Sequence, residues 1–204
     1  KKMKYDGVVI GGGPAGMFAA IVAAKQGGRV LLLEKNDRLG KKLLITGKGR
    51  CNVTNNCSAE EVLQNIPRNG RFLNSALNAF SPADIMSFLE KEGCELKTER
   101  GNRVFPVSDR STSVLDALKK AMHNSGVTVE QASVRKIETD GVNVTGVVTN
   151  HKSIPCKWVI LATGGLSYPT TGSTGDGYTL AKNVGHTIVD PIPSLVPLVC
   201  TEKI

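Results

Sequence analysis

The chain has 204 residues, of which 40% are apolar and 22% charged, so it has the composition of a globular protein with room for one large domain and part of a second. Its net charge is +8, but only 4% of its residues are aromatic, which argues against a stacking platform for nucleic acid. The absence of an apolar run long enough to cross a membrane, of a leader-like start and of any CxxC pair among five cysteines predicts a cytoplasmic protein without membrane, disulfide framework or metal site.

The first expected elements are a strand, a helix and a second strand. Residues Tyr5–Ile10 are short and rich in β-branched side chains, as in a buried parallel strand. Residues Pro14–Gln26 are all compatible with a helix, which Gly27 and Gly28 end. Residues Arg29–Glu34 then predict a second buried strand that ends on a carboxylate.

A glycine-rich turn joins the first strand to the helix and has the spacing of a dinucleotide-binding turn. Gly11 would allow the tight turn, Gly13 the approach of a pyrophosphate, and Gly16 the close packing of helix on strand. The free N–H groups of the helix start favour phosphates, and a carboxylate at the end of the second strand favours ribose hydroxyls and repels the 2′-phosphate of NADP. These predicted cofactor-binding residues are Gly11, Gly13, Pro14, Ala15, Gly16 and Glu34.

The next stretch, residues 35–57, reads as a long and therefore functional loop. Its basic residues are Lys35, Arg38, Lys41, Lys42, Lys48 and Arg50. They fit a solvated surface, a patch that follows nucleic-acid phosphates, or the neighbourhood of a pyrophosphate bound at the glycine turn. We favour the last interpretation for some of these charges.

Helices and a β-meander are expected further along. The predicted helices are Ala59–Ile66, Gly70–Phe80, Pro82–Glu92 and Ser111–Ser125, with two short strands within residues 96–106. The predicted later strands are Val127–Val129, Val134–Thr139, Val142–Thr149 and Trp158–Leu161, with residues 150–155 as a turn. The pattern predicts an α/β fold in which a Rossmann-like parallel sheet carries flanking helices and a β-meander.

A second glycine turn, Ala162–Gly165, follows the last strand directly, as expected at the crevice of an open α/β sheet. A further glycine-rich segment precedes a helix predicted at Tyr178–Val184. Asp176 in that segment is either a ligand to sugar hydroxyls or the N-cap of this helix, and the residues do not decide between the two.

Two longer motifs resemble one family. Residues 40–55, GKKLLITGKGRCNVTN, resemble the G-[RK]-K-x-x-x-[ST]-G-x-G-R-C-N-x-T-N signature of the bacterial FAD flavoproteins called BaiN-like or aminoacetone-oxidase-like. Residues 102–108, NRVFPVS, resemble its [GN]-R-x-F-P-x-[ST] segment, and residues 162–165 and 172–178 resemble its later signatures. The resemblance runs from Tyr5 to about Pro197.

The resemblance implies that FAD is the cofactor. The first turn would hold its pyrophosphate, Glu34 its adenosine ribose and Val134 its adenine, while the Thr46–Asn52 loop would pass near the isoalloxazine and ribityl chain. The other residues implied to border FAD are Lys35, Lys42, Thr46, Gly49, Arg50, Cys51, Asn52, Ala162, Thr163, Gly164, Gly165 and Asp176.

Arg50 and Cys51 are the candidate catalytic residues. A guanidinium at Arg50 could stabilise negative charge on reduced flavin, and Cys51 is either a redox group or a small buried hydrophobe.

Members of the family are about twice as long as this chain. We therefore expect residues 1–190 to form the FAD-binding domain without its C-terminal return, and residues 191–204 to begin a second, substrate-side domain. The expected function is hydride transfer between FAD and a small amine, alcohol or activated alkene, with NAD(P)H or oxygen as redox partner. The alternatives are an NAD-dependent dehydrogenase and a nucleotide- or RNA-binding module without redox chemistry.

Overall fold

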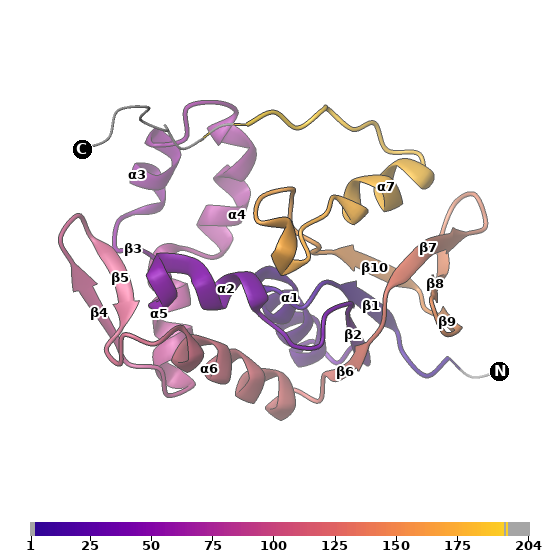
Figure 1. Ribbon diagram of the computed structural model, residues 1–204, viewed down its shortest axis with the longest axis horizontal. Coiled ribbons are helices and arrows are strands. Elements are labelled where there is room, and N and C mark those ends of the chain that lie inside the picture. Colours follow the sequence, from indigo (N-terminus) through magenta and orange to yellow (C-terminus); the bar gives the residue numbers. More distant parts are fainter. Residues whose placement is uncertain (1–2, 194, 196–204) are drawn as a thin grey trace, which may run out of the picture.

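A parallel sheet forms the centre of the computed structural model, which describes residues 3–193 and 195 (Figure 1). Its strands run in the order β10–β1–β2–β6. Their bounds are β1 Gly7–Ile10, β2 Val30–Glu34, β6 Thr128–Gln131 and β10 Trp158–Leu161. The two expected glycine turns follow β1 and β10, and because these strands are parallel neighbours, both turns lie at one edge of the sheet.

The first two strands are connected by α1 (Pro14–Lys25), as predicted. Proline at the first helical position is compatible with a helix start because it lacks only an N–H that would have no intrahelical partner. The helix ends before Gly27, whose φ of +90° favours glycine. Both strands are buried along their whole length, which explains their continuous apolar sequence.

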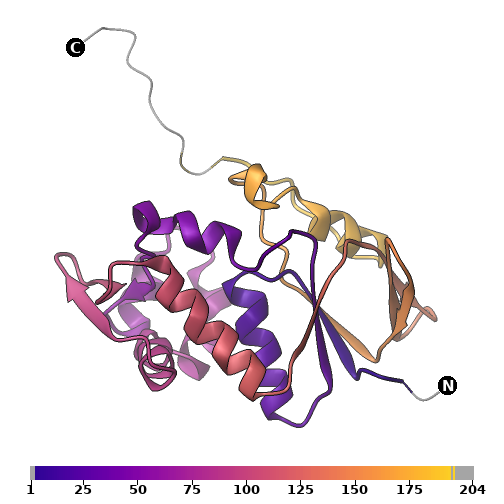
Figure 2. The same cartoon turned by 60° about the horizontal axis from the view of Figure 1, so that its bottom comes forward.

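The sheet has a core on each face because its side chains alternate. Val9 and Leu32 face α1 and α6 (Ser111–Asn124), whereas Val8 and Leu31 face the meander. Figure 2 shows the two helices and the meander on different sides of the strands. All four of these side chains are fully buried, and each contributes roughly 1.5–3 kcal/mol through burial.

The meander is an antiparallel sheet in the order β7–β8–β9, made of β7 Val134–Thr139, β8 Val144–Thr149 and β9 Ser153–Pro155. The prediction of residues 150–155 as a turn is wrong for its second half. Val147 of β8 pairs with Ile154, which is buried and contributes to the core between the meander and the parallel sheet. This sheet and α7 (Asp176–Asn183) pack on the same face of the parallel sheet and lie together at the right of Figure 1.

The segment between β2 and α6 is more structured than expected. Residues 35–57 contain α2 (Lys41–Ile45), the 3-10 turn η1 (Thr46–Gly49) and β3 (Thr54–Asn55), so the prediction of one long loop is wrong. β3 joins a small sheet in the order β3–β5–β4, with β4 Leu96–Glu99 and β5 Arg103–Pro106. This small sheet supports the end of the GKGRCN motif.

The remaining helices are α3 (Ala59–Gln64), the 3-10 turn η2 (Gly70–Leu73), α4 (Asn74–Ala79) and α5 (Pro82–Lys91). The single helix predicted over Gly70–Phe80 is therefore two shorter pieces. Phe18 of α1 packs against Phe80 and Phe88, with ring centroids 4.6 and 5.1 Å apart, which ties α4 and α5 to the parallel sheet.

The expected second domain, residues 191–204, lies largely outside the described residues. A 3-10 turn, η3 (Pro169–Thr171), lies between the second glycine turn and α7. Within residues 3–193 and 195, every helix is too short or too polar to cross a membrane.

Candidate functional site

The two glycine turns touch each other. Gly11 has a φ of +109°, and a Cβ atom on it would lie 2.4 Å from the carbonyl oxygen of Ala162. A Cβ on Gly16 would lie 1.8 Å from the carbonyl oxygen of Gly11. A larger residue at Gly11 would therefore push the two turns apart, and one at Gly16 would push α1 away from the first turn. Gly13 differs, because a Cβ there would meet no protein atom within 4 Å.

The first turn leaves the amino end of α1 open. Gly13 is the N-cap residue in an extended conformation, and no side chain caps the helix. Its first turn carries no acidic residue. The first N–H groups of a helix have no intrahelical partners and the dipole there is positive, so this end favours an anion.

A cavity of about 310 Å³ opens in front of this helix end. Apolar groups line one part, among them Ile10, Ala132, Val134 and Leu180. The predicted site residues that line it are Gly11, Gly13, Pro14, Ala15, Glu34, Lys35, Lys42, Val134, Ala162, Thr163, Gly164 and Asp176. We call this space the main cavity.

Glu34 stands in the main cavity with both carboxylate oxygens engaged. Oε2 accepts a hydrogen bond of 2.7 Å from the backbone N–H of Gly12. Oε1 accepts from the backbone N–H and the side-chain amide of Asn36, at 2.8 and 2.7 Å. Glu34 is 9% exposed, so these bonds fix a nearly buried carboxylate at the carboxyl end of β2.

Hydrogen bonds from Lys35 and Asn36 tie the end of β2 to the segment at residues 171–176. We call these two side chains and their partners in that segment the clasp. Lys35 Nζ donates to Asp176 Oδ2 at 2.6 Å and to Thr174 Oγ1 at 2.7 Å. Asn36 Nδ2 donates to the carbonyl oxygen of Thr171 at 3.2 Å. The hydrogen bond from Lys35 is the main reason that the pKa of Asp176 lies below its usual range.

The structure excludes one of the two roles left open for Asp176 and adds a residue to the site. Gly175, not Asp176, is the N-cap of α7, and Asp176 is the first residue of the helix. Asn36 was not predicted, because a single asparagine after a strand gives no sequence signal for contacts with a segment more than 130 residues away.

A second, more apolar cavity of about 250 Å³ lies beside the first. Pro14 and Lys42 line both cavities, so the two adjoin at the amino end of α1. Thr46, Cys51 and Asn52 of the predicted site line the second cavity only. Its other lining residues are Phe18, Leu43, Val53, Ile85, Leu89, Val114 and Leu118.

Cys51 is 5% exposed, and burial raises the pKa of its thiol. A thiol that stays protonated at neutral pH is a weak nucleophile. The geometry favours the interpretation of Cys51 as a small buried hydrophobe in the cavity wall.

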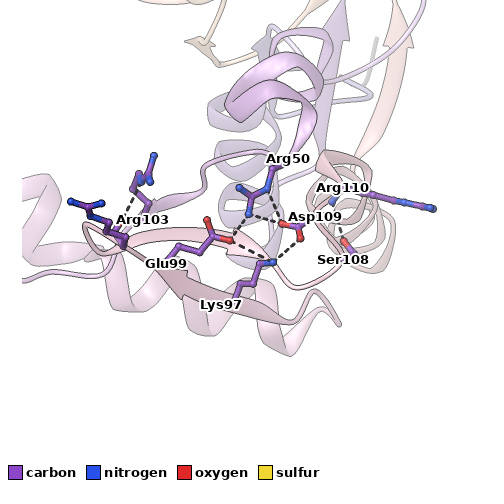
Figure 3. A network of polar contacts seen from close by, with 8 residues as sticks. Arg50, Lys97, Glu99, Arg103, Ser108, Asp109 and Arg110 are labelled. Atoms are coloured by element: carbon purple, nitrogen blue, oxygen red, sulfur yellow. Dashed lines mark hydrogen bonds and ion pairs between the residues drawn. The ribbon is translucent and has the colours of Figure 1, made fainter.

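Arg50 lies outside both cavities. Its guanidinium stacks on the ring of Phe105 at 4.1 Å and pairs with Glu99 and Asp109 (Figure 3). Those two carboxylates are also the main reason that the pKa of the guanidinium is raised. The contact of Arg50 with the cofactor or substrate therefore stays a prediction, which this arrangement does not favour.

The other predicted residues also divide into those that line a cavity and those that do not. Gly16 packs behind the turn, and Gly49 and Gly165 line neither cavity. Of the basic residues after β2, Lys35, Lys41 and Lys42 line the main cavity, whereas Arg38, Lys48 and Arg50 do not. The preferred interpretation, that some of these charges lie near a pyrophosphate, thus fits three of the six.

Comparison with known proteins agrees with this geometry. Residues 5–194 match the HI0933-like protein Rossmann domain. A 3-dehydro-bile acid delta(4,6)-reductase of Clostridium scindens is 35% identical over 194 residues, which make up 93% of this chain and 46% of the relative. A ribosomal RNA dihydrouridine synthase of Escherichia coli is 31% identical over 195 residues, 95% of this chain and 48% of the relative.

Solved structures share the fold. The open conformation of a flavocytochrome c3 fumarate reductase superposes with a TM-score of 0.71 at 23% identity, covering 91% of this chain and 41% of the other. The 3-ketosteroid-delta4-(5alpha)-dehydrogenase of Rhodococcus jostii gives a TM-score of 0.65 at 17% identity, covering 90% and 54%. The chain spans about half the length of the curated relatives it matches. With its glycine turns, acid and GKGRCN loop around two adjoining cavities, the chain belongs to the HI0933-like family of FAD-binding proteins.

Proposed function

We propose that this chain binds FAD across the two adjoining cavities and serves as the cofactor domain of a flavin-dependent reductase. The observation that carries the proposal is that Pro14 and Lys42 line both cavities. The amino end of α1, which favours an anion, therefore lies between the main cavity, whose wall includes Glu34, and the more apolar second cavity. A dinucleotide has this order of parts, with a pyrophosphate between two different ring systems.

The residues present fit such a group. The main cavity offers Glu34 for ribose hydroxyls and an apolar wall that includes Val134 for adenine. At Gly13 no protein atom would touch a Cβ, which leaves room for a phosphate against the backbone. The second cavity would take the flavin end, beside Thr46 and Asn52.

FAD, when bound, supplies two-electron hydride chemistry. The protein's own contribution is orientation and exclusion of water. The apolar wall of the second cavity, which includes Leu43 and Leu89, keeps that end dry. Lys42 brings a positive charge to the junction of the cavities, where a pyrophosphate would be. The buried thiol of Cys51 stays protonated and fills space.

We further propose that the substrate of the whole protein is a compound with a carbon–carbon double bond conjugated to a carbonyl group. Support comes from the names of the two curated relatives. One reduces bile-acid double bonds designated delta(4,6), and dihydrouridine is uridine whose ring double bond has been saturated. Of the substrates expected from the sequence, the activated alkene is thus favoured over the amine and the alcohol. NAD(P)H or oxygen as redox partner and a cytoplasmic location remain predictions.

Titration of the purified chain with FAD tests the cofactor proposal. Flavin absorbance that survives desalting, with NAD⁺ unable to displace it, would support it. Retention of NAD⁺ in preference to FAD would favour the NAD-dependent dehydrogenase instead. Salt-sensitive binding of RNA with no affinity for either dinucleotide would favour the RNA-binding module.

The substrate proposal needs the longer protein, because this chain covers about half of its relatives. Reduced enzyme should be reoxidised by a conjugated enone or by uridine-containing RNA, and not by the saturated analogues. Reoxidation by neither class, together with flavin reduction by an amine or alcohol, would contradict it.

A further inference from the structure

The loop from Thr46 to Asn52, which we call the cavity loop, has an unusual backbone. Gly47, Lys48, Gly49 and Cys51 all have positive φ angles, at 56°, 57°, 85° and 62°. Lys48 and Cys51 are not glycines, and side chains disfavour this region. Such a conformation persists only where surrounding contacts determine it.

Arg50 provides contacts of this kind on the side of the loop away from the cavity. Nε donates to Asp109 Oδ1 at 2.8 Å, and a terminal nitrogen of the guanidinium pairs with Glu99. Lys97 pairs with the same two carboxylates, at 2.7 Å to Asp109 and 3.5 Å to Glu99. In Figure 3 these four charged groups converge, whereas the side chain of Arg110 points away.

The network reaches three separate elements. Glu99 ends β4, Asp109 lies between β5 and α6, and Phe105 of β5 lies under the guanidinium at 4.1 Å. Phe105 is 4% exposed, and its ring would also lie 3.2 Å from a Cβ on Gly47. The ring therefore lies beside the loop at two points, under the guanidinium of Arg50 and next to Gly47, where it leaves no room for a side chain.

We propose that Arg50 is a positioning residue, which holds the cavity loop against Phe105, Glu99 and Asp109 so that Thr46, Cys51 and Asn52 form the wall of the second cavity. The two positive and two negative charges balance within the network, so Arg50 acts by geometry and not by lending charge to a ligand. The loop placement stands on the contacts themselves, and only its effect on cofactor binding rests on the proposed function.

Peptide-resolved alkylation with iodoacetamide tests the loop placement without any cofactor. Cys51 reports on the cavity loop, whereas Cys156 is also buried, in the core between the meander and the parallel sheet, and reports on the rest of the fold. In Arg50→Met we expect the alkylation rate of Cys51 to rise about tenfold, with Cys156 unchanged. Arg50→Lys, which keeps the charge but loses the planar stack and fork, should fall between the two.

Arg29→Met is the matched control. Arg29 forms a forked pair with Asp6, at 2.9 and 3.0 Å, at the opposite ends of β1 and β2 from the glycine turns. Loss of that pair should leave Cys51 as protected as in the unchanged chain. Equal exposure of Cys51 and Cys156 in Arg50→Met, or no change at Cys51, would overturn the positioning role.

FAD titration of the same variants then tests the consequence for binding. We expect Arg50→Met to weaken FAD about tenfold and Arg29→Met to leave it unchanged. A failure of the unchanged chain to bind FAD would count against the proposed function and not against the loop placement, which the alkylation decides. Selective exposure of Cys51 with full FAD affinity would overturn the link between loop and cofactor.

Discussion

The carboxylate of Glu34 and the backbone N–H of Gly12 are joined by a 2.7 Å hydrogen bond between the end of β2 and the turn after β1. The acid that the sequence assigns to ribose binding therefore also fixes the turn that would meet the pyrophosphate. Asn36 completes this arrangement by donating twice to the other carboxylate oxygen.

Replacement of Glu34 by glutamine is the first test of this arrangement. All three bonds to Glu34 come from donors, and an amide offers only one oxygen to accept them, so one donor is left facing an NH₂ group. We expect Glu34→Gln to lower the free energy of unfolding by about 1–3 kcal/mol and to weaken FAD binding. Urea denaturation and FAD titration measure the two effects.

The control is Asp37→Asn, a nearby exposed carboxylate that pairs with Lys41 at 3.1 Å. It should change stability by less than about 1 kcal/mol. Equal effects of the two substitutions would show that Glu34 has no special part in the turn.

Alanine at Gly13 and at Gly16 should separate a ligand-facing glycine from a packing glycine. Gly13 has a φ of −76°, which alanine adopts freely, and its added methyl group would meet only open space. Gly13→Ala should therefore keep or slightly raise the melting temperature and still lose FAD affinity. Gly16→Ala should lower the melting temperature strongly, because its methyl group would overlap the carbonyl oxygen of Gly11. Unchanged FAD affinity in a stable Gly13→Ala would argue against a phosphate at this turn.

We expect Lys35→Met to loosen the clasp without unfolding the rest of the chain. Without Lys35, Asp176 and Thr174 lose their shared donor, and we expect faster hydrogen exchange over residues 171–176, together with weaker FAD binding. Lys182→Met removes an exposed lysine from α7 and serves as the control. Faster exchange that spreads through the whole of α7 and the parallel sheet would instead indicate general destabilisation.

Protonation of Asp6 should account for part of the loss of folding stability in acid. Hydrogen bonds from Arg29 hold the pKa of this carboxyl far below its usual range. A carboxyl with a lowered pKa in the folded state stabilises the fold above its unfolded pKa, and this contribution is lost as the pH falls below about 4. Urea midpoints measured from pH 7 to pH 3 should therefore drop less in Asp6→Asn than in the unchanged chain. Parallel curves for the two would contradict this role.

The parallel sheet was predictable because its signals are local. The residues from Tyr5 to Glu34 combine a β-branched run, a glycine turn and an alanine-rich helix, and each of these favours the same structure. β9 was missed because Pro155 and the polar residues before Ser153 are typical of a turn, and only pairing with Val147 makes the segment a strand.

The site was predictable where one segment contains it and not where distant segments meet. The glycine turns are recognisable from their spacing, and both contribute residues to the main cavity. Of the GRCN signature, Cys51 and Asn52 line the second cavity, and Arg50 lines neither. Its neighbours Glu99 and Asp109 lie at the end of β4 and after β5, and no local pattern indicates that a guanidinium will turn toward them.

The strand order has a consequence for how the protein is made. β1 lies in the middle of the parallel sheet, yet one of its two partners is β10, whose Val159 pairs with Val8. β1 ends at Ile10 and β10 begins only at Trp158, so a ribosome releases the second strand long after the first. Until then one edge of a wholly apolar strand has no partner, and pairings between such distant segments form slowly. The growing chain thus carries an exposed strand edge until β10 has been made, and such an edge can pair wrongly with other extended apolar segments.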